Sequence, residues 1–416
     1  MERYHIIGNK SLEGEHQLKG AKNAVLPILA ATILTGSTSV IENCPDLSDD
    51  RTMVAILKEM GCKVTWENGS IIVDSSTLDD YVIPQKHMKE IRSSVFLMGP
   101  TLARCGKVSL SYPGGCAIGE RPIDIHLYAL RLLGVEIKEK DGLLDCSVDR
   151  LIGTDIHLPF PSVGATENAM MAAIMAEGET TIYNPAKEPE IVDLQNYLNS
   201  CGAEVYGAGS DEIVIKGKRE LRDTIYKVIP DRIEGGTFLA AAAATGGSIQ
   251  LRNAIPAHMS FVINKLREAG CQIIVEKDMV YLKAPDKLKA VKPIETSPYP
   301  GFPTDMQSQF MALMTCADGY TLITENIFEN RFKHVKELIK MGADIQIEGN
   351  TAIVKGVEKL KGAHVKAMDL RGGASLVIAG LAAEGTTIVE NICHIDRGYD
   401  KFELALSKLG ANIKRI

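Results

Sequence analysis

The sequence has few aromatic residues, no surplus of positive charge and no long hydrophobic run. Aromatic residues make up 5% of the 416 residues, and Trp66 is the one tryptophan. The sequence has 46 lysines and arginines and 53 aspartates and glutamates. Because this gives no excess of positive charge, a protein that coats nucleic acid is disfavoured. No apolar stretch approaches the roughly 20 residues that cross a bilayer, so we expect a soluble protein without membrane insertion or a signal peptide.

The cysteines also lack a pattern. There are nine, an odd number, and they are scattered without the paired spacing of a metal site. This usage predicts reduced thiols in a cytoplasmic protein, with neither a disulfide framework nor a zinc site.

What the sequence does contain is an internal repeat. A helix that ends in glycine and continues into alternating strands recurs six times, as in MGCKVTWENGSIIV and MGADIQIEGNTAIVKG. The glycines at these helix ends are Gly61, Gly134, Gly202, Gly270, Gly342 and Gly410, which lie 68 to 73 residues apart. The period is too long for the common solenoids and indicates six units of one supersecondary structure.

A second marker recurs in phase with the first, a short strand that usually ends in asparagine, as in GSTSVIEN and GETTIYN. The copy GKVSLSYPGG lacks the asparagine and continues into a glycine-rich stretch. A departure from the local rule in one copy is where a function is to be sought.

The two helices of each unit differ in composition. Segments such as AVLPILAATIL and GGTFLAAAAA are apolar nearly all round, whereas segments such as HVKELIKMG are amphipathic. This pattern predicts an α/β fold with central buried helices and outer sheets. Three units in each globule give an N-terminal domain over 22–229 and a C-terminal domain over 230–416 completed by 1–21, because residues 3–9 resemble the missing partner of the last strand.

Polar residues precede each predicted buried helix, and the repeat places them at equivalent positions. They are Lys22, Asn23, Arg92, Ser162, Thr166, Asp231, Arg232, Asp305, Asp369 and Arg371. The loops before the amphipathic helices add Asp49, Arg121, Glu188, Arg331 and Arg397. These residues are expected either to bind an anionic substrate at helix N-termini or to act only as caps and surface ion pairs.

Two of the loops contain candidate catalytic groups. Cys116 lies among glycines in SYPGGCAIGERP, five residues before Arg121, and a nearby arginine lowers the pKa of a thiol. Other cysteines, such as Cys62 and Cys201, are interpreted as small packing residues. Asp305 follows three prolines, where it is either a helix cap or a general base.

At this point the motifs resemble those of the UDP-N-acetylglucosamine 1-carboxyvinyltransferase family of enolpyruvyl transferases. They are KGAKNAVLPILAA, SYPGGCAIGERPIDIH, FPSVGATENAM, FPTDMQ, DLRGGASL and HIDRGYDKFE. The resemblance covers the whole chain and implies two inside-out α/β barrel domains with the active site in the cleft between them. It also implies transfer of the enolpyruvyl group of phosphoenolpyruvate to the 3′-hydroxyl of UDP-N-acetylglucosamine, the first committed step of peptidoglycan synthesis. No metal or organic cofactor is implied.

The resemblance also assigns roles to single residues. Cys116 matches the cysteine that donates a proton to the methylene carbon of phosphoenolpyruvate and that can also bind this substrate covalently. Asp305 matches the group that takes the proton of the 3′-hydroxyl. The cations that match the phosphoenolpyruvate site are Lys22, Arg121 and Arg397, with Asn23 and Arg92 beside them. The residues that match the uracil and sugar sites are Pro122, Ile123, Asp124, Ile125, Ser162, Val163, Gly164 and Ile327, with Arg331, Asp369 and Arg371 in support. Phe160 stands where some members have a lysine at the diphosphate.

Three other functions compete with this one. A shikimate-3-phosphate enolpyruvyl transferase shares the six-unit fold, but the PGGC loop argues against it. A non-catalytic paralogue that binds a UDP-sugar is disfavoured because Cys116, Asp305, Arg121 and Arg397 are all retained. RNA 3′-phosphate cyclases have a similar fold, but the net charge of −7 makes this activity remote.

Overall fold

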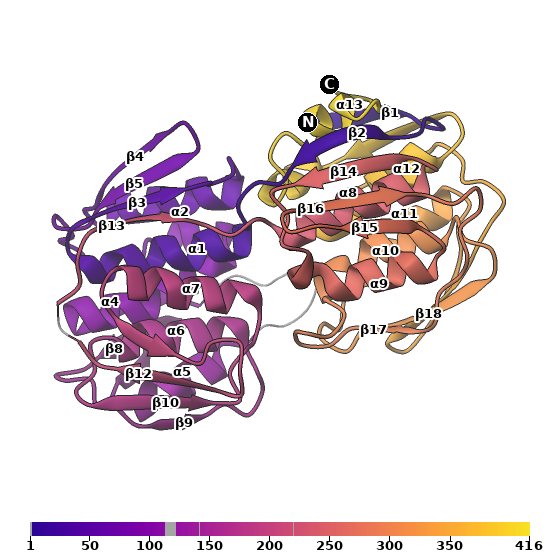
Figure 1. Ribbon diagram of the computed structural model, residues 1–416. Coiled ribbons are helices and arrows are strands. Elements are labelled where there is room, and N and C mark those ends of the chain that lie inside the picture. The colour runs from indigo at the N-terminus through magenta and orange to yellow at the C-terminus, as the bar shows by residue number, and fades with distance from the viewer. Residues whose placement is uncertain (1, 113–121, 141, 219) are drawn as a thin grey trace. The chain divides into compact units, whose positions relative to one another are not determined.

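The computed structural model describes residues 2–112, 122–140, 142–218 and 220–416. The described chain forms two compact units (Figure 1). We call the unit that lies between Gly20 and Ile229 the N-terminal unit. The C-terminal unit contains Pro230–Ile416 together with the residues up to Lys19. Among the described helices, none is long and apolar enough to span a membrane.

The N-terminal unit contains three sheets around its helices. In spatial order the strands are β13 (Thr224–Lys227), β3 (Thr38–Glu42), β5 (Ser70–Asp74) and β4 (Lys63–Glu67); β6 (Lys107–Ser111), β8 (Leu143–Ser147) and β7 (Glu136–Lys140); and β11 (Glu204–Tyr206), β12 (Glu212–Lys216), β10 (Glu179–Tyr183) and β9 (Asp155–His157). The α-helices are α1 (Lys22–Ala31), α2 (Ser48–Glu59), α3 (Gln85–Glu90), α4 (Met98–Cys105), α5 (Asp124–Leu132), α6 (Val163–Ala173) and α7 (Pro189–Ser200).

The C-terminal unit repeats this plan. Its sheets are β21 (His364–Lys366), β22 (Thr386–Glu390), β1 (Arg3–Ile7) and β23 (Asn412–Arg415); β15 (Gln272–Val275), β16 (Met279–Lys283), β14 (Ser248–Arg252) and β2 (Glu13–Gln17); and β17 (Ile294–Glu295), β18 (Tyr320–Thr324), β20 (Thr351–Lys355) and β19 (Asp344–Glu348). Its α-helices are α8 (Arg232–Ala244), α9 (Ser260–Glu268), α10 (Gln307–Met314), α11 (Val335–Lys340), α12 (Leu370–Ala382) and α13 (Phe402–Lys408).

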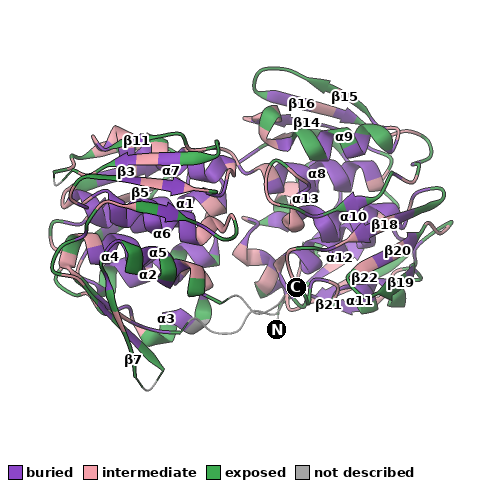
Figure 2. Cartoon of the chain, turned by 90° about the horizontal axis from the view of Figure 1, so that it is seen from below, coloured by how far each residue is buried: buried purple, intermediate pink, exposed green. Residues whose placement is uncertain are grey.

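The central helices are buried nearly all round, as the sequence predicts (Figure 2). Every residue of α10 is buried, and α8 is buried from Ile233 to Ala243. Its alanines allow the three central helices of the unit to approach one another closely. The sheets lie outside these helices, so the inside-out arrangement of the fold is confirmed.

Each sheet joins strands from two neighbouring repeats. A hairpin such as β4–β5 pairs antiparallel with β3, and β13 pairs parallel with the other edge of β3. In the three-stranded sheet a single parallel bridge between Val82 and Ser109 takes the place of that edge strand. The predicted pairing of the two ends of the chain is confirmed, because β1 lies between β22 and β23.

The structure explains both repeat markers. The six helix-ending glycines all have φ between 89° and 99°, a backbone conformation that residues with a Cβ rarely adopt. In three of the sheets, a strand-ending asparagine ties down the parallel edge strand. Asn43, Asn184 and Asn253 adopt φ of 54° to 65° and donate from Nδ2 to the carbonyls of Val228, Leu158 and Leu18 at 2.9 to 3.0 Å. The asparagine is therefore a structural residue.

Candidate active site

Asp305 lies between two buried arginines in the C-terminal unit. Its Oδ1 is 2.7 Å from Nη2 of Arg331, and its Oδ2 is 3.0 Å from Nη2 of Arg371. The arginine side chains are 3% exposed and that of Asp305 is 28% exposed. Asp305 does not occupy an N-cap position, because the N-cap residues are Pro303 for the short helix Thr304–Met306 and Met306 for α10. Its carboxylate is oriented by two guanidinium groups and still reaches solvent.

Asp231 and Asp369, which also precede central helices of this unit, are helix caps. Asp231 accepts hydrogen bonds from the first turn of α8, and Asp369 does the same at α12. Burial opposes the charge of Arg371, but the neighbouring Asp305, Tyr399 and Asp231 raise its pKa. These contacts bring the starts of all three central helices of the unit to one charged cluster.

Arg397 and Asp369 lie near the same histidine. Arg397 ends the 3₁₀-helix Ile392–Arg397 and is half-buried. Burial and the charge of Arg397 lower the pKa of His394, while the charge of Asp369 raises it. Asp369 also acts on His334, whose pKa is lowered to about 4 by burial, so that this ring is neutral at pH 7. The C-terminal unit thus groups Asp305, Arg331, Asp369, Arg371 and Arg397 at one end of its central helices.

Ile327 follows β18 in a loop held by a buried glutamate. Oε1 of Glu325 accepts hydrogen bonds from the backbone amide of Ile327 at 2.9 Å and from the hydroxyl of Thr296 at 2.9 Å. Its Oε2 accepts from the hydroxyl of Thr304 at 2.9 Å. Glu325 therefore links the Ile327 loop to the residue that precedes Asp305.

In the N-terminal unit, Lys22 is the first residue of α1 and is paired with an aspartate of α2. Nζ of Lys22 is 2.7 Å from Oδ2 of Asp49, and the two side chains are 10% and 4% exposed. Asn23, the next residue of α1, is half-buried. A lysine at a helix N-terminus opposes the helix dipole, and Asp49 offsets that cost.

Arg92 and the predicted uracil segment meet at a buried histidine. Arg92 begins the 3₁₀-helix Arg92–Leu97. Burial and the charge of Arg92 lower the pKa of His126 to about 3. His126 directly follows the segment 122–125, in which Pro122 and Asp124 are exposed, Ile125 is half-buried and Ile123 is buried.

The residues that match the sugar site lie at the start of α6. Ser162 caps this helix, its Oγ accepting from the amide of Ala165 at 3.4 Å, and Val163 and Gly164 form the first turn. Phe160 is 45% exposed, and its carbonyl accepts from the amide of Ser162 at 2.7 Å. The three segments predicted to bind substrate therefore lie at the starts of α5, α6 and the helix that begins at Arg92.

Cys116 and Arg121 lie outside the described residues. Among the other cysteines, burial raises the pKa of Cys62 and Cys271 to about 12 and of Cys201 to about 11. Such thiols stay protonated at pH 7, which confirms their interpretation as packing residues. In the described part of the chain, no group of histidine, cysteine, aspartate and glutamate has the arrangement of a metal site.

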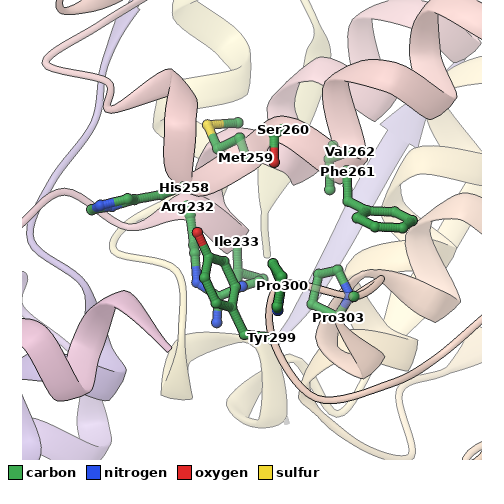
Figure 3. A pocket seen from close by; sticks show the side chains of 11 residues that line it. Arg232, Ile233, His258, Met259, Ser260, Phe261, Val262, Tyr299, Pro300 and Pro303 are labelled. Carbon is green, nitrogen blue, oxygen red and sulfur yellow. The ribbon is translucent and has the colours of Figure 1, made fainter. Parts of the chain in front are cut away.

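A surface pocket lies beside the start of α8 (Figure 3). It is shallow and is lined by Arg232, His258, Phe261 and Tyr299 among others. The guanidinium carbon of Arg232 is 5.5 Å from the centre of the Tyr299 ring. Of the predicted catalytic residues that the structure describes, none lines this pocket, so the candidate site is defined by the charged clusters and not by this cavity.

Sequence reasoning missed four buried polar residues near these clusters. Tyr399 is 2% exposed, its hydroxyl is 2.8 Å from Oγ1 of Thr237, and the guanidinium carbon of Arg371 lies 5.4 Å from its ring centre. His126, Asn168 and His334 are also buried. A polar residue on an apolar helix face was the available signal for Asn168, whereas the surroundings of the other three depend on distant segments.

Comparison with known proteins identifies the family. The family model described as EPSP synthase (3-phosphoshikimate 1-carboxyvinyltransferase) matches residues 6–406. UDP-N-acetylglucosamine 1-carboxyvinyltransferase 2 of Caldanaerobacter subterraneus is 52% identical to this chain over 416 residues, and the alignment covers 100% of both chains. UDP-N-acetylglucosamine 1-carboxyvinyltransferase 1 of Symbiobacterium thermophilum is 53% identical, with all of this chain and 95% of the relative covered.

Solved structures agree on the fold. The enolpyruvyl transferase NikO from Streptomyces tendae has a TM-score of 0.89 at 25% identity, with 100% of this chain and 98% of that chain covered. An EPSP synthase from Acinetobacter baumannii has a TM-score of 0.77 at 20% identity, with both chains covered completely. The protein therefore belongs to the enolpyruvyl transferases and, within them, to the UDP-N-acetylglucosamine 1-carboxyvinyltransferase family.

Proposed function

We propose that the protein transfers the enolpyruvyl group of phosphoenolpyruvate to the 3′-hydroxyl of UDP-N-acetylglucosamine and releases phosphate, the first committed step of peptidoglycan synthesis. The observation that carries this proposal is identity of about half over the full length of relatives with that named activity. The orientation of Asp305 by Arg331 and Arg371 supports it, because a held carboxylate that reaches solvent suits proton transfer.

Addition requires an acid on one side of phosphoenolpyruvate and a base on the side of the acceptor. Cys116 donates a proton to the methylene carbon, which makes the adjacent carbon electrophilic. Asp305 accepts the proton of the 3′-hydroxyl as its oxygen attacks that carbon. The tetrahedral adduct then loses phosphate, which takes up the proton that Asp305 received from the hydroxyl. The Cys116 thiolate takes a proton back from the methyl group, so that the enol ether forms and both side chains return to their starting states.

Cations hold the anionic groups of phosphoenolpyruvate and of the adduct. We assign this role to Lys22, Arg121 and Arg397, with Asn23 and Arg92 beside them. Guanidinium groups match phosphate and carboxylate geometrically, and fixed cations stabilise the adduct better than mobile water does. The ion pair between Lys22 and Asp49 supports a lysine held in one orientation.

The nucleotide sugar is bound by segments of both units. We assign the uracil to Pro122, Ile123, Asp124 and Ile125, and the remaining contacts to Ser162, Val163, Gly164 and Ile327. Arg331, Asp369 and Arg371 support Asp305. The proposal requires Lys22 of one unit and Asp305 of the other to act on the same pair of substrates, with the domains spanning 22–229 and 230–416 plus 1–21. It places the reaction in the cytoplasm, which suits reduced cysteines.

Phosphate release tests the proposal. Purified protein is incubated with phosphoenolpyruvate alone, with UDP-N-acetylglucosamine, and with shikimate 3-phosphate. We expect sustained release only with the UDP-sugar. Release that depends on shikimate 3-phosphate would assign the other enolpyruvyl transfer, and absence of release with either acceptor would leave only UDP-sugar binding.

A further inference from the structure

Asn168 lies on α6, is fully buried, and bonds to three separate segments. Its Nδ2 is 3.1 Å from the carbonyl oxygen of Val95, 2.9 Å from Nδ1 of His126 and 3.3 Å from the carbonyl oxygen of Gly164. An amide has only two hydrogens, so the two shorter contacts are the stronger ones.

The orientation of this amide is fixed by a fourth contact. Oδ1 of Asn168 accepts a hydrogen bond from the backbone amide of Gly99 at 2.7 Å. Nδ2 therefore faces His126, and Nδ1 of that ring must be the acceptor. It follows that His126 is neutral and carries its proton on Nε2.

The neutral ring lies against the first turn of α6. A Cβ at Gly164 would approach Cε1 of His126 to 2.8 Å and Nε2 to 3.1 Å. The ring that Asn168 contacts at Nδ1 thus packs directly against Gly164.

Two of the three segments that Asn168 joins are assigned to the nucleotide sugar, and the third begins with Arg92, which is assigned to phosphoenolpyruvate. Val95 is three residues after Arg92, His126 follows the segment 122–125, and Gly164 belongs to the segment 162–164. We propose that Asn168 is a positioning residue that holds these three segments in the arrangement that binds UDP-N-acetylglucosamine. The inference rests on the proposed function, because it concerns the binding site for the same substrate.

Two variants and a matched control test this role. Asn168→Leu removes all four contacts, whereas Asn168→Asp keeps the acceptor for Gly99 and loses the donors. The control is Asn199→Leu, because Asn199 also bonds to backbone, accepting from the amide of Val205 at 2.9 Å and donating to its carbonyl at 2.8 Å. It lies at the end of α7, outside the assigned segments. The measurements are UDP-N-acetylglucosamine affinity by calorimetry, kcat and KM in the phosphate assay, and stability by urea unfolding.

We expect both Asn168 variants to weaken UDP-N-acetylglucosamine binding by about tenfold or more, because misplacement by about 1 Å has effects of up to about a hundredfold. KM for the UDP-sugar rises while kcat at saturation falls less, and Asn199→Leu loses stability without loss of affinity. Equal affinities in the Asn168 variants and the control would overturn the inference. If Asn168→Leu does not fold, Asn168→Asp decides alone. A wild-type protein that does not bind the UDP-sugar would instead refute the proposed function.

Discussion

Nζ of Lys22 lies 2.7 Å from Oδ2 of Asp49, and both side chains are almost completely buried. The lysine assigned to phosphoenolpyruvate is thus held by a carboxylate on the neighbouring helix. We predict that Asp49→Ala raises KM for phosphoenolpyruvate about tenfold, because the freed lysine samples other rotamers. The control is Asp46→Ala, which breaks the exposed pair between Asp46, just before α2, and Arg51 on the same helix as Asp49. Equal KM values in the two variants would show that Asp49 does not orient Lys22.

Asp305→Asn keeps the shape of the side chain but removes the proton acceptor and the charge facing Arg331 and Arg371. We predict a fall in kcat of about a hundredfold or more, within the range that general bases contribute, with UDP-N-acetylglucosamine still bound. Rapid-quench kinetics in both directions and calorimetry measure the two effects. Wild-type rates in this variant would leave Asp305 with a structural role only.

Cys116→Ser is predicted to lose most turnover while UDP-N-acetylglucosamine binding stays nearly unchanged, since a hydroxyl is a much weaker acid than a thiol. Cys116→Asp is expected to keep part of the activity, because a carboxylic acid also delivers a proton, and to resist thiol-alkylating epoxides such as fosfomycin. Phosphate release with and without the epoxide measures both. Full activity of Cys116→Ser would remove the thiol from its assigned role.

Gly164→Ala tests the close packing at the start of α6. The new Cβ would lie 2.8 Å from Cε1 of His126 and 3.1 Å from Cε1 of Phe96, and two aromatic rings cannot both give way without shifting the segments that carry them. We predict a loss of UDP-N-acetylglucosamine affinity together with destabilisation of about 1–3 kcal/mol. Gly142→Ala adds backbone strain, because φ of Gly142 is 74°, but no atom lies within 4 Å of the new Cβ. As the control, it is expected to lose stability without losing UDP-N-acetylglucosamine affinity.

The buried side chain of His334 should make the free energy of unfolding depend on pH. Burial lowers its pKa to about 4, whereas the unfolded histidine has a pKa of about 6.5. As pH falls, His334 therefore binds a proton in the unfolded state before it does so in the folded state. Its contribution to the free energy of unfolding is present above about pH 6.5 and is lost between about pH 6.5 and 4. In that range the free energy of unfolding falls by up to about 1.4 kcal/mol per pH unit. Urea unfolding between pH 7 and 5 should show a smaller slope for His334→Gln than for the wild type. Identical slopes would contradict a buried neutral His334.

The sequence predicted the fold well because the fold is periodic. Glycine at each helix end and apolar residues all round the central helices are local signals, and the pairing of β1 with β23 was visible as a missing hairpin strand. The roles of single residues were harder to predict. Asp305 was weighed as a cap, and its two arginines lie 26 and 66 residues away in the sequence. Asn168 bonds to a residue 73 positions away in the sequence, so its network becomes visible only in three dimensions.

The pairing of the two chain ends has a consequence for synthesis on the ribosome. Strand β1 is translated almost 400 residues before its neighbours β22 and β23. At about 5–20 residues per second, both edges of β1 wait unpaired on the order of 20 to 80 seconds. The N-terminal unit has its whole chain available before that, whereas the C-terminal unit is completed only when β23 has been translated.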